Sequence, residues 1–420
     1  MKKGISLKTN FKWMFASNIV FALFQWLLLI VLTKLGNQEL VGMYTLGLAI
    51  TAPIMIFSNL QLRAIQATDA NNENEFKDFL SLRLFAMLFG LLVCTVIIFY
   101  SGYSIQLCLI IFLIAISKAI EGLNDIVYGF LQKIEDMNKI AISLILRAVL
   151  GFVLFSLSFY FTKSLQIAII GLSLAWLLVL ILWDIKKLFK HNINFTLHFN
   201  FKVLSRLFYV SVPLGFVSML GSLNTNLPRY IIENQLSLEA LGIFGAISYV
   251  LVGASKFTTS INQTVSPRLA RYYSNGNKHQ FLSLFKKTLS INLVFGLLGF
   301  VVVYFWGEEI LTIVYSSEYA DHYVLFRWIM IVSVLSFITS AFGVAVTSMR
   351  IFAMQLPIHL IKLLSITITS IFFIGKYGLK GAPLALAVST LVSMIFYFQL
   401  FRKGIKNINN GMTDTAKTKV

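Results

Sequence analysis

The feature that most constrains this chain is a series of apolar stretches, each about 20 residues long, that recurs along its whole length. A helix of about this length crosses the ~30 Å hydrocarbon core of a bilayer, where backbone polar groups must be satisfied within the segment. The short-period alternation typical of barrel strands is absent. Only 12% of the 420 residues are charged, whereas a soluble domain has about a quarter. The pattern predicts an all-α, multi-pass membrane protein.

Twelve membrane spans are predicted. They cover residues 11–34, 41–62, 80–100, 105–128, 140–161, 165–183, 208–232, 240–262, 283–305, 323–347, 353–374 and 381–401. We expect a first lobe at residues 1–200, a second lobe at 201–406 and a disordered cytoplasmic tail at 407–420. Between the spans of the two lobes lies a linker, Asp184–Arg206, which would be either a segment lying on the anionic inner leaflet or an ordinary charged connection.

The two lobes are expected to be copies of one six-helix unit. The segment Glu39–Tyr44 (E-L-V-G-M-Y) is echoed by Glu239–Phe244 (E-A-L-G-I-F), and an apolar span, a polar loop and a further span follow each. Six spans return the chain to the side on which it started. The two copies must then be related by a pseudo-two-fold axis along the membrane normal, with a cavity expected at their interface.

The basic residues predict the orientation. If the N-terminus is cytoplasmic, the inner segments hold most of the 35 Lys and Arg residues. The outer loops hold Lys34, Lys163, Arg229, Lys376 and Lys380. This bias places both termini in the cytoplasm. The net charge of +18 is therefore an orientation signal, and no nucleic-acid partner is expected.

Three ionisable residues lie in the predicted fourth span. Lys118, Glu121 and Asp125 are three and four residues apart and so share one helical face. An ionisable side chain at mid-depth costs from ~2.5 to more than 10 kcal/mol, which makes each a functional candidate. One interpretation is that these three residues face the cavity. Glu121 is then the first choice for ion coupling, because it would lie among apolar neighbours, and Asp125 is the second. The alternative is that Lys118 and Glu121 neutralise each other and that Asp125 lies near the inner water interface.

Other polar residues in the spans are candidates for the cavity wall. Together with Lys118, the substrate-cavity candidates are Asn18, Gln25, Arg63, Asn224, Arg229 and Lys256. Pro228 predicts a broken helix beside Arg229. Snorkelling is the default interpretation of Arg63, and a structural role is expected for Arg147, which lies close enough to a span end to snorkel. His359, three residues before Lys362, is a third ion-coupling candidate or else a polar contact between helices.

Motifs for catalysis are absent from the sequence. It contains no phosphate-binding loop, nucleophile elbow or His/Cys metal-ligand spacing. The two cysteines, Cys94 and Cys108, lie in apolar spans and suggest neither a disulfide nor a metal site. We expect no enzyme activity and no cofactor.

The chain resembles the bacterial polysaccharide repeat-unit flippases (Wzx type) of the multidrug/oligosaccharidyl-lipid/polysaccharide exporter superfamily. The residues that carry the resemblance are Gly42-x-Tyr44, Pro53, Leu60–Arg63 (L-Q-L-R), Ala67–Asp69 (A-T-D) and Leu82–Leu84 (L-R-L). The resemblance implies a MATE-like bundle of two lobes in the bacterial cytoplasmic membrane. It also implies a cationic cavity that passes a polyprenyl-diphosphate-linked oligosaccharide to the outer leaflet, coupled to H⁺ or Na⁺. Membrane lipids, a polysaccharide polymerase and glycosyltransferases are the expected partners.

Two other functions fit parts of the pattern. A multidrug cation antiporter of the same architecture should concentrate carboxylates in one lobe. Glu121 and Asp125 are the acids within the predicted spans, whereas five basic residues lie in the apolar runs, namely Lys118, Arg147, Lys256, Arg327 and Lys362. A membrane enzyme of polysaccharide assembly should have a large loop, and no outer loop is long enough. Both are weaker alternatives to the flippase.

Overall fold

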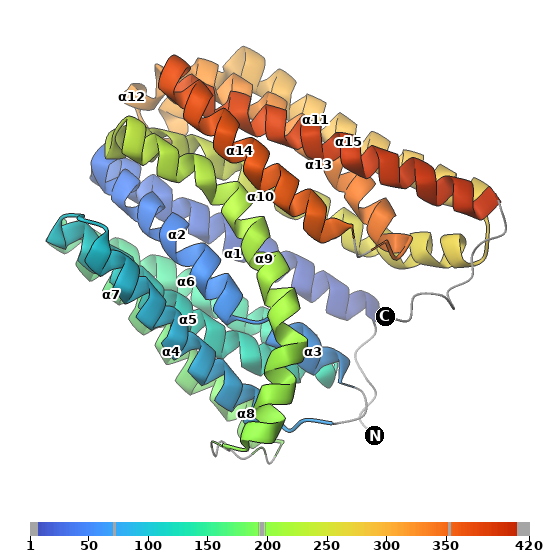
Figure 1. The fold of residues 1–420 in the computed structure, drawn as a ribbon. Coiled ribbons are helices and arrows are strands. Elements are labelled where there is room, and N and C mark those ends of the chain that lie inside the picture. Colours follow the sequence, from blue (N-terminus) through green and yellow to red (C-terminus); the bar gives the residue numbers. More distant parts are fainter. Residues whose placement is uncertain are drawn as a thin grey trace. The chain divides into compact units, whose positions relative to one another are not determined.

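The computed structural model is built of α-helices (Figure 1). It describes residues 7–69, 73–191, 193, 197, 199–351 and 354–409, and only the backbone of residues 7–11, 263, 408 and 409. These ranges contain no strand and 11 helical stretches long and apolar enough to cross a membrane. The last stretch holds two helices separated by the 3-10 turn Gly378–Lys380, so the twelve predicted spans are confirmed. The predicted tail begins as the end of the last helix, and residues 410–420 lie outside the described ones.

The chain divides into two compact units, Met1–Asn226 and Leu227–Val420. The first contains α1 (Leu7–Leu35), α2 (Gln38–Ser58), α3 (Leu62–Thr68), α4 (Phe76–Tyr100), α5 (Ile105–Lys133), α6 (Met137–Thr162), α7 (Leu165–Val179), the π-helix η1 (Leu180–Ile185), α8 (Lys186–Phe189) and most of α9 (Phe201–Gln235). The second contains α10 (Leu238–Ser274), α11 (Lys278–Val314), α12 (Ser317–Ala320), α13 (Tyr323–Ser348), α14 (Gln355–Tyr377), the turn η2 and α15 (Gly381–Asn409). Residue 200, the expected end of the first lobe, precedes α9, whereas this division falls inside α9.

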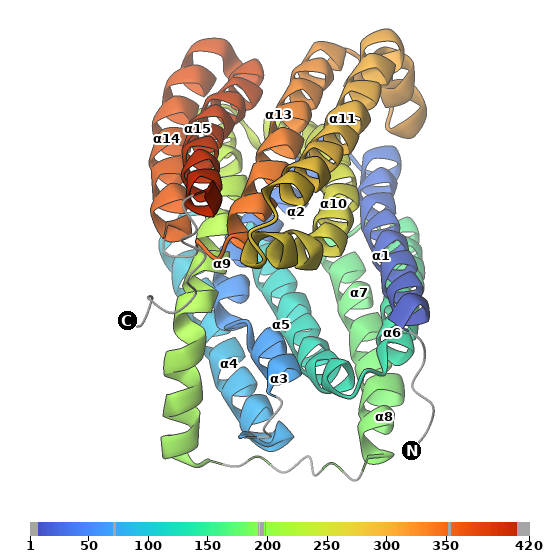
Figure 2. The same ribbon diagram turned by 90° about the vertical axis from the view of Figure 1, so that its right-hand side faces the viewer.

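Helix α5 is the centre of the first unit, with α3 and α4 on one side and α7 on the other (Figure 2). It also packs against α2 and α6. Glycines allow two of these close approaches: a Cβ at Gly129 would lie 3.2 Å from the Cα of Arg63 in α3, and one at Gly122 would lie 2.9 Å from the sulfur of Met87 in α4. Side chains on α5 can therefore reach several other helices.

The second unit repeats the packing of the first. In the first unit α2 packs against α4 and α5, α5 against α4 and α7, and α6 against α7. In the second, α10 packs against α11 and α13, α13 against α11 and α15, and α14 against α15. The echoed segments also begin alike, since Asn37 caps α2 and Ser237 caps α10 through bonds from the third following backbone N–H. The predicted duplication is confirmed at the level of helix packing.

Some predicted helix ends are wrong. The second span ends at Ser58, because Leu60 and Gln61 adopt left-handed backbone angles (φ 49° and 51°) and start a new helix at Leu62. The sixth span does not stop at residue 183 but runs through η1 and α8 to Phe189. The helix predicted to break at Pro228 is continuous, because α9 runs through it to Gln235.

Candidate functional site

Polar side chains follow one side of α5 for most of its length. They are Ser117, Lys118, Glu121, Asn124, Asp125, Tyr128 and Gln132. Spacings of three and four residues place them along one helical face. The structure joins them to charged and polar residues of α3, α4, α6 and η1 in a single network within the first unit.

The first cluster is centred on Asp125 and is called the Asp125 triad. Its carboxylate accepts from the Arg63 guanidinium at 3.0 Å and from the Arg83 guanidinium at 3.4 Å. The Arg83 side chain is fully buried, whereas those of Arg63 and Asp125 are each 29% exposed. Arg83 also donates to Asn59, and Arg63 Nε donates to Gln132 at 3.1 Å. The L-Q-L-R and L-R-L motifs thus meet on one carboxylate.

The second cluster, called the Glu121 triad, lies one turn earlier on α5. Lys118 Nζ lies 2.8 Å from one oxygen of Glu121, and Arg147 of α6 lies 3.4 Å from the other. The Arg147 side chain is 2% exposed and its guanidinium lies over Trp176, 4.6 Å from the ring centre. Arg147 therefore lies inside the protein and does not snorkel. The premise that Glu121 lies among apolar neighbours is wrong, because two cations also surround it.

The two triads share one design. Each holds two cations and one carboxylate, a formal charge of +1. In each, one arginine is buried and the other cation is partly exposed, Arg63 in one and Lys118 in the other. A buried guanidinium is costly unless it is paired and hydrogen-bonded. The carboxylates therefore hold Arg83 and Arg147 in the interior, which leaves Arg63 and Lys118 as the cations open to a ligand.

A third carboxylate, Asp184, was assigned by the sequence to the linker, and this is wrong. It is fully buried in η1, and its Oδ2 accepts a hydrogen bond from Asn124 at 2.6 Å. No Lys or Arg of the described residues lies within 4.0 Å of it, unlike Glu121 and Asp125. A π-helix shifts the register of one turn and is frequent at functional sites. Hydropathy could not reveal this shift, because Trp183-Asp184 followed by lysines matches a span end.

The A-T-D motif contacts the C-terminal end of α5. Asp69 accepts from the backbone N–H groups of Glu73 and Asn74, and its Oδ2 lies 3.4 Å from Lys133 Nζ at the end of α5. Burial alone would raise the pKa of Asp69. The two backbone donors and Lys133 outweigh it, so the pKa lies below its ordinary value of 3.8. Asp69 therefore anchors the α3–α4 connection to α5 as a carboxylate.

The remaining predicted site residues lie outside this network. Asn18, on the exposed side of α1, donates to the Met14 carbonyl at 2.8 Å, and Gln25 is half-buried on the same helix. Asn224 is buried in α9. In the second unit Arg229 is half-buried, Lys256 is exposed on α10 and His359 lines a pocket described below.

Comparison with known proteins identifies the family of this chain. Residues 7–273 match the family described as polysaccharide biosynthesis protein. The chain belongs to that family. It is 32% identical over 400 residues to a capsular polysaccharide biosynthesis protein, CapF, of Staphylococcus aureus, with 94% of this chain and 99% of that protein aligned.

Solved structures show the fold. An inward-facing multidrug resistance MATE transporter matches with a TM-score of 0.75 at 14% identity, over 98% of this chain and 97% of the other. The lipid II flippase MurJ in an inward closed conformation matches with a TM-score of 0.73 at 14% identity, over 96% and 93%. The MATE-like fold and the polysaccharide family predicted from the sequence are both confirmed.

Proposed function

We propose that this protein flips a polyprenyl-diphosphate-linked oligosaccharide from the inner to the outer leaflet of the bacterial cytoplasmic membrane, for the assembly of a surface polysaccharide. The observation that carries the proposal is the pair of triads, each with a net positive charge and a partly exposed cation. The family match and the flippase among the structures of the same fold support it.

The physical problem for such a substrate is its head. Each unpaired polar group in hydrocarbon costs several kcal/mol, so a diphosphate with sugars cannot cross bare lipid. Arg63 and Lys118 would each donate charge-assisted hydrogen bonds to a phosphate oxygen. Their carboxylate partners prevent these cations from holding the anion too firmly to release it. An inside-negative potential favours the outward movement of an anion by ~2.3 kcal/mol per charge per 100 mV.

Ion coupling is assigned to Asp184 in this proposal rather than to Glu121, Asp125 or His359. Glu121 and Asp125 are each paired with two cations and hold a buried arginine in place. Asp184 is buried and held by the neutral Asn124. A proton taken up by Asp184 would remove a negative charge from the interior of the unit, where Arg147 of the Glu121 triad is also buried, and so alter that triad.

Reconstitution tests the function. The purified protein is placed in liposomes that carry a polyprenyl-diphosphate oligosaccharide with a fluorescent sugar in the inner leaflet, and exposure of the label to an external quencher is followed. We expect quenching to be faster than in protein-free liposomes and to depend on a pH gradient in the wild type but not in Asp184→Asn. A rate equal to that of empty liposomes would overturn the proposed function. A gradient-dependent rate in Asp184→Asn would overturn only the coupling residue.

A further inference from the structure

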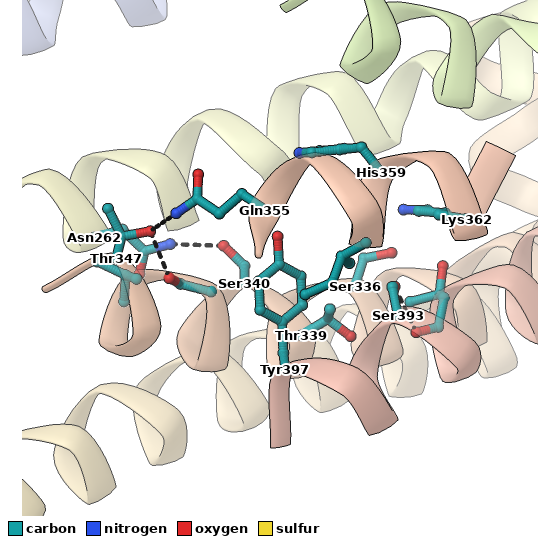
Figure 3. Close-up of a pocket in the computed structure, with 14 residues that line it drawn as sticks. Asn262, Ser336, Thr339, Ser340, Thr347, Gln355, His359, Lys362, Ser393 and Tyr397 are labelled. Atoms are coloured by element: carbon teal, nitrogen blue, oxygen red, sulfur yellow. Dashed lines mark hydrogen bonds between the residues drawn. The ribbon is translucent and has the colours of Figure 1, made fainter. Parts of the chain in front are cut away.

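The second unit contains a polar pocket within its own helices. It has a volume of about 350 Å³ and lies among α10, α13, α14 and α15 (Figure 3). Most of its lining residues carry a hydroxyl, amide or nitrogen group, although these helices are apolar enough to span a membrane. Polar groups placed together inside membrane helices are costly unless they serve a ligand or each other. The pocket has the size of a small-molecule site, and its lining is more polar than is usual for one.

The charge in this pocket is positive and unbalanced. Lys362 extends from α14 into the pocket, and His359 lies one turn earlier on the same helix (Figure 3). No Asp or Glu is among the lining residues, and no described carboxylate lies within ion-pair distance of Lys362. An unpaired ammonium in a membrane helix favours an anionic ligand. The absence of acidic groups from the lining disfavours a metal ion or an organic cation.

The neutral groups of the pocket offer both acceptors and donors. The hydroxyls of Thr339 and Ser393 donate to helix carbonyls at 2.8 and 2.9 Å, so their lone pairs are left to accept. The Thr347 hydroxyl also donates to a helix carbonyl, at 2.8 Å, but it already accepts from the Gln355 amide at 3.0 Å. The Asn262 amide donates to Ser340 at 2.6 Å, while its oxygen is buried without a donor. A ligand that hydrogen-bonds to these acceptors and pairs with Lys362 must carry both hydrogen-bond donors and a negative charge.

We infer that the pocket binds an acidic sugar, with its carboxylate at Lys362 and its hydroxyl groups on the side chains of α10, α13 and α15. One ring of a sugar acid carries the anion and several hydroxyl donors spread around the ring, whereas the one or two O–H groups of inorganic phosphate sit on a single phosphorus atom beside its charge. This site belongs to the second unit alone and is separate from the two triads of α5. The inference concerns binding and does not rest on lipid flipping.

Binding of radiolabelled D-glucuronate to the full-length protein in detergent tests the inference, with unlabelled competitors. We expect glucuronate to compete at least 10-fold better than glucose or inorganic phosphate, and choline not to compete. Lys362→Met should weaken glucuronate binding at least 10-fold, and Lys362→Arg should keep it within about 3-fold. Lys376→Met is the matched control, since Lys376 lies on the same helix over Phe372 and Tyr377 and does not line the pocket.

Several results would overturn the inference. They are equal competition by glucose, stronger competition by phosphate than by glucuronate, and unchanged binding in Lys362→Met. A thermal unfolding midpoint of Lys362→Met within a few degrees of the wild type verifies that lost binding is not lost folding. If Lys362→Met does not fold, Ser393→Leu, which fills the pocket without touching its charge, should abolish binding, and retained binding there contradicts the inference.

Discussion

Replacement of Asp125 by Asn is the most informative perturbation of the first unit. It keeps the shape of the side chain and removes the charge that Arg83 and Arg63 share. Arg83 is fully buried and cannot turn to water, whereas Arg63 is 29% exposed and can. Breaking a buried ion pair by removing one partner costs about 3–5 kcal/mol, and the amide oxygen still accepts one hydrogen bond. We expect Asp125→Asn to destabilise the protein by about 3 kcal/mol.

Reversible unfolding of the purified protein in mixed micelles measures this cost. The control is Glu73→Gln, which breaks the Glu73–Arg206 pair, whose side chains are 48% and 70% exposed. An exposed pair is worth about 0–1 kcal/mol, so the control should change stability by no more than that. Arg83→Met combined with Asp125→Asn should recover most of the loss, because no buried charge then lacks a partner. Equal effects of Asp125→Asn and Glu73→Gln would refute the reasoning.

Three further outcomes are expected. Because the pKa of Asp69 is lowered in the folded state, its carboxylate adds stability above pH ~4 that is lost as the pH falls through the folded pKa. The stability difference between the wild type and Asp69→Asn, followed by thermal unfolding, should therefore shrink below pH ~4, and a constant difference would contradict this. Gly129→Leu should destabilise by about 1–3 kcal/mol and slow flipping, because α3 contacts α5 there, while Gly221→Ala, which has open space at its Cβ, should change neither. Tyr315→Phe should cost about 1 kcal/mol in the same unfolding assay, because its buried hydroxyl donates to the Ala246 carbonyl at 2.7 Å, and an unchanged stability would argue against that bond.

The sequence predicted the class of fold because each membrane helix is an uninterrupted apolar stretch long enough to cross a bilayer. It also predicted that Lys118, Glu121 and Asp125 share a face, since helical periodicity sets this. The partners of that face could not be predicted. Arg83 and Arg147 come from other helices, and a single sequence does not reveal which helices pack together.

Local backbone geometry accounts for the other errors. The left-handed residues Leu60 and Gln61 end α2 early and turn Arg63 toward α5. The π-helix brings Asp184 into the interior, whereas the charge pattern predicted that Asp184 begins a charged linker. In both cases a shift of one or two residues changes which side chain is buried. Hydropathy averaged over about 20 residues does not resolve such a shift.

The flipping rates of two matched lipids test the central claim, that Arg63 and Lys118 bind the anionic head group of the lipid substrate. One lipid is a polyprenyl-diphosphate oligosaccharide, and the other carries the same sugars on a neutral polyprenyl ether. The double variant Arg63→Gln, Lys118→Met should slow the diphosphate lipid at least 10-fold relative to the wild type and remove its advantage over the neutral one. Lys163→Gln, a change to an exposed cation outside both triads, should leave both rates unchanged. A double variant that still flips the diphosphate lipid at the wild-type rate would contradict the account.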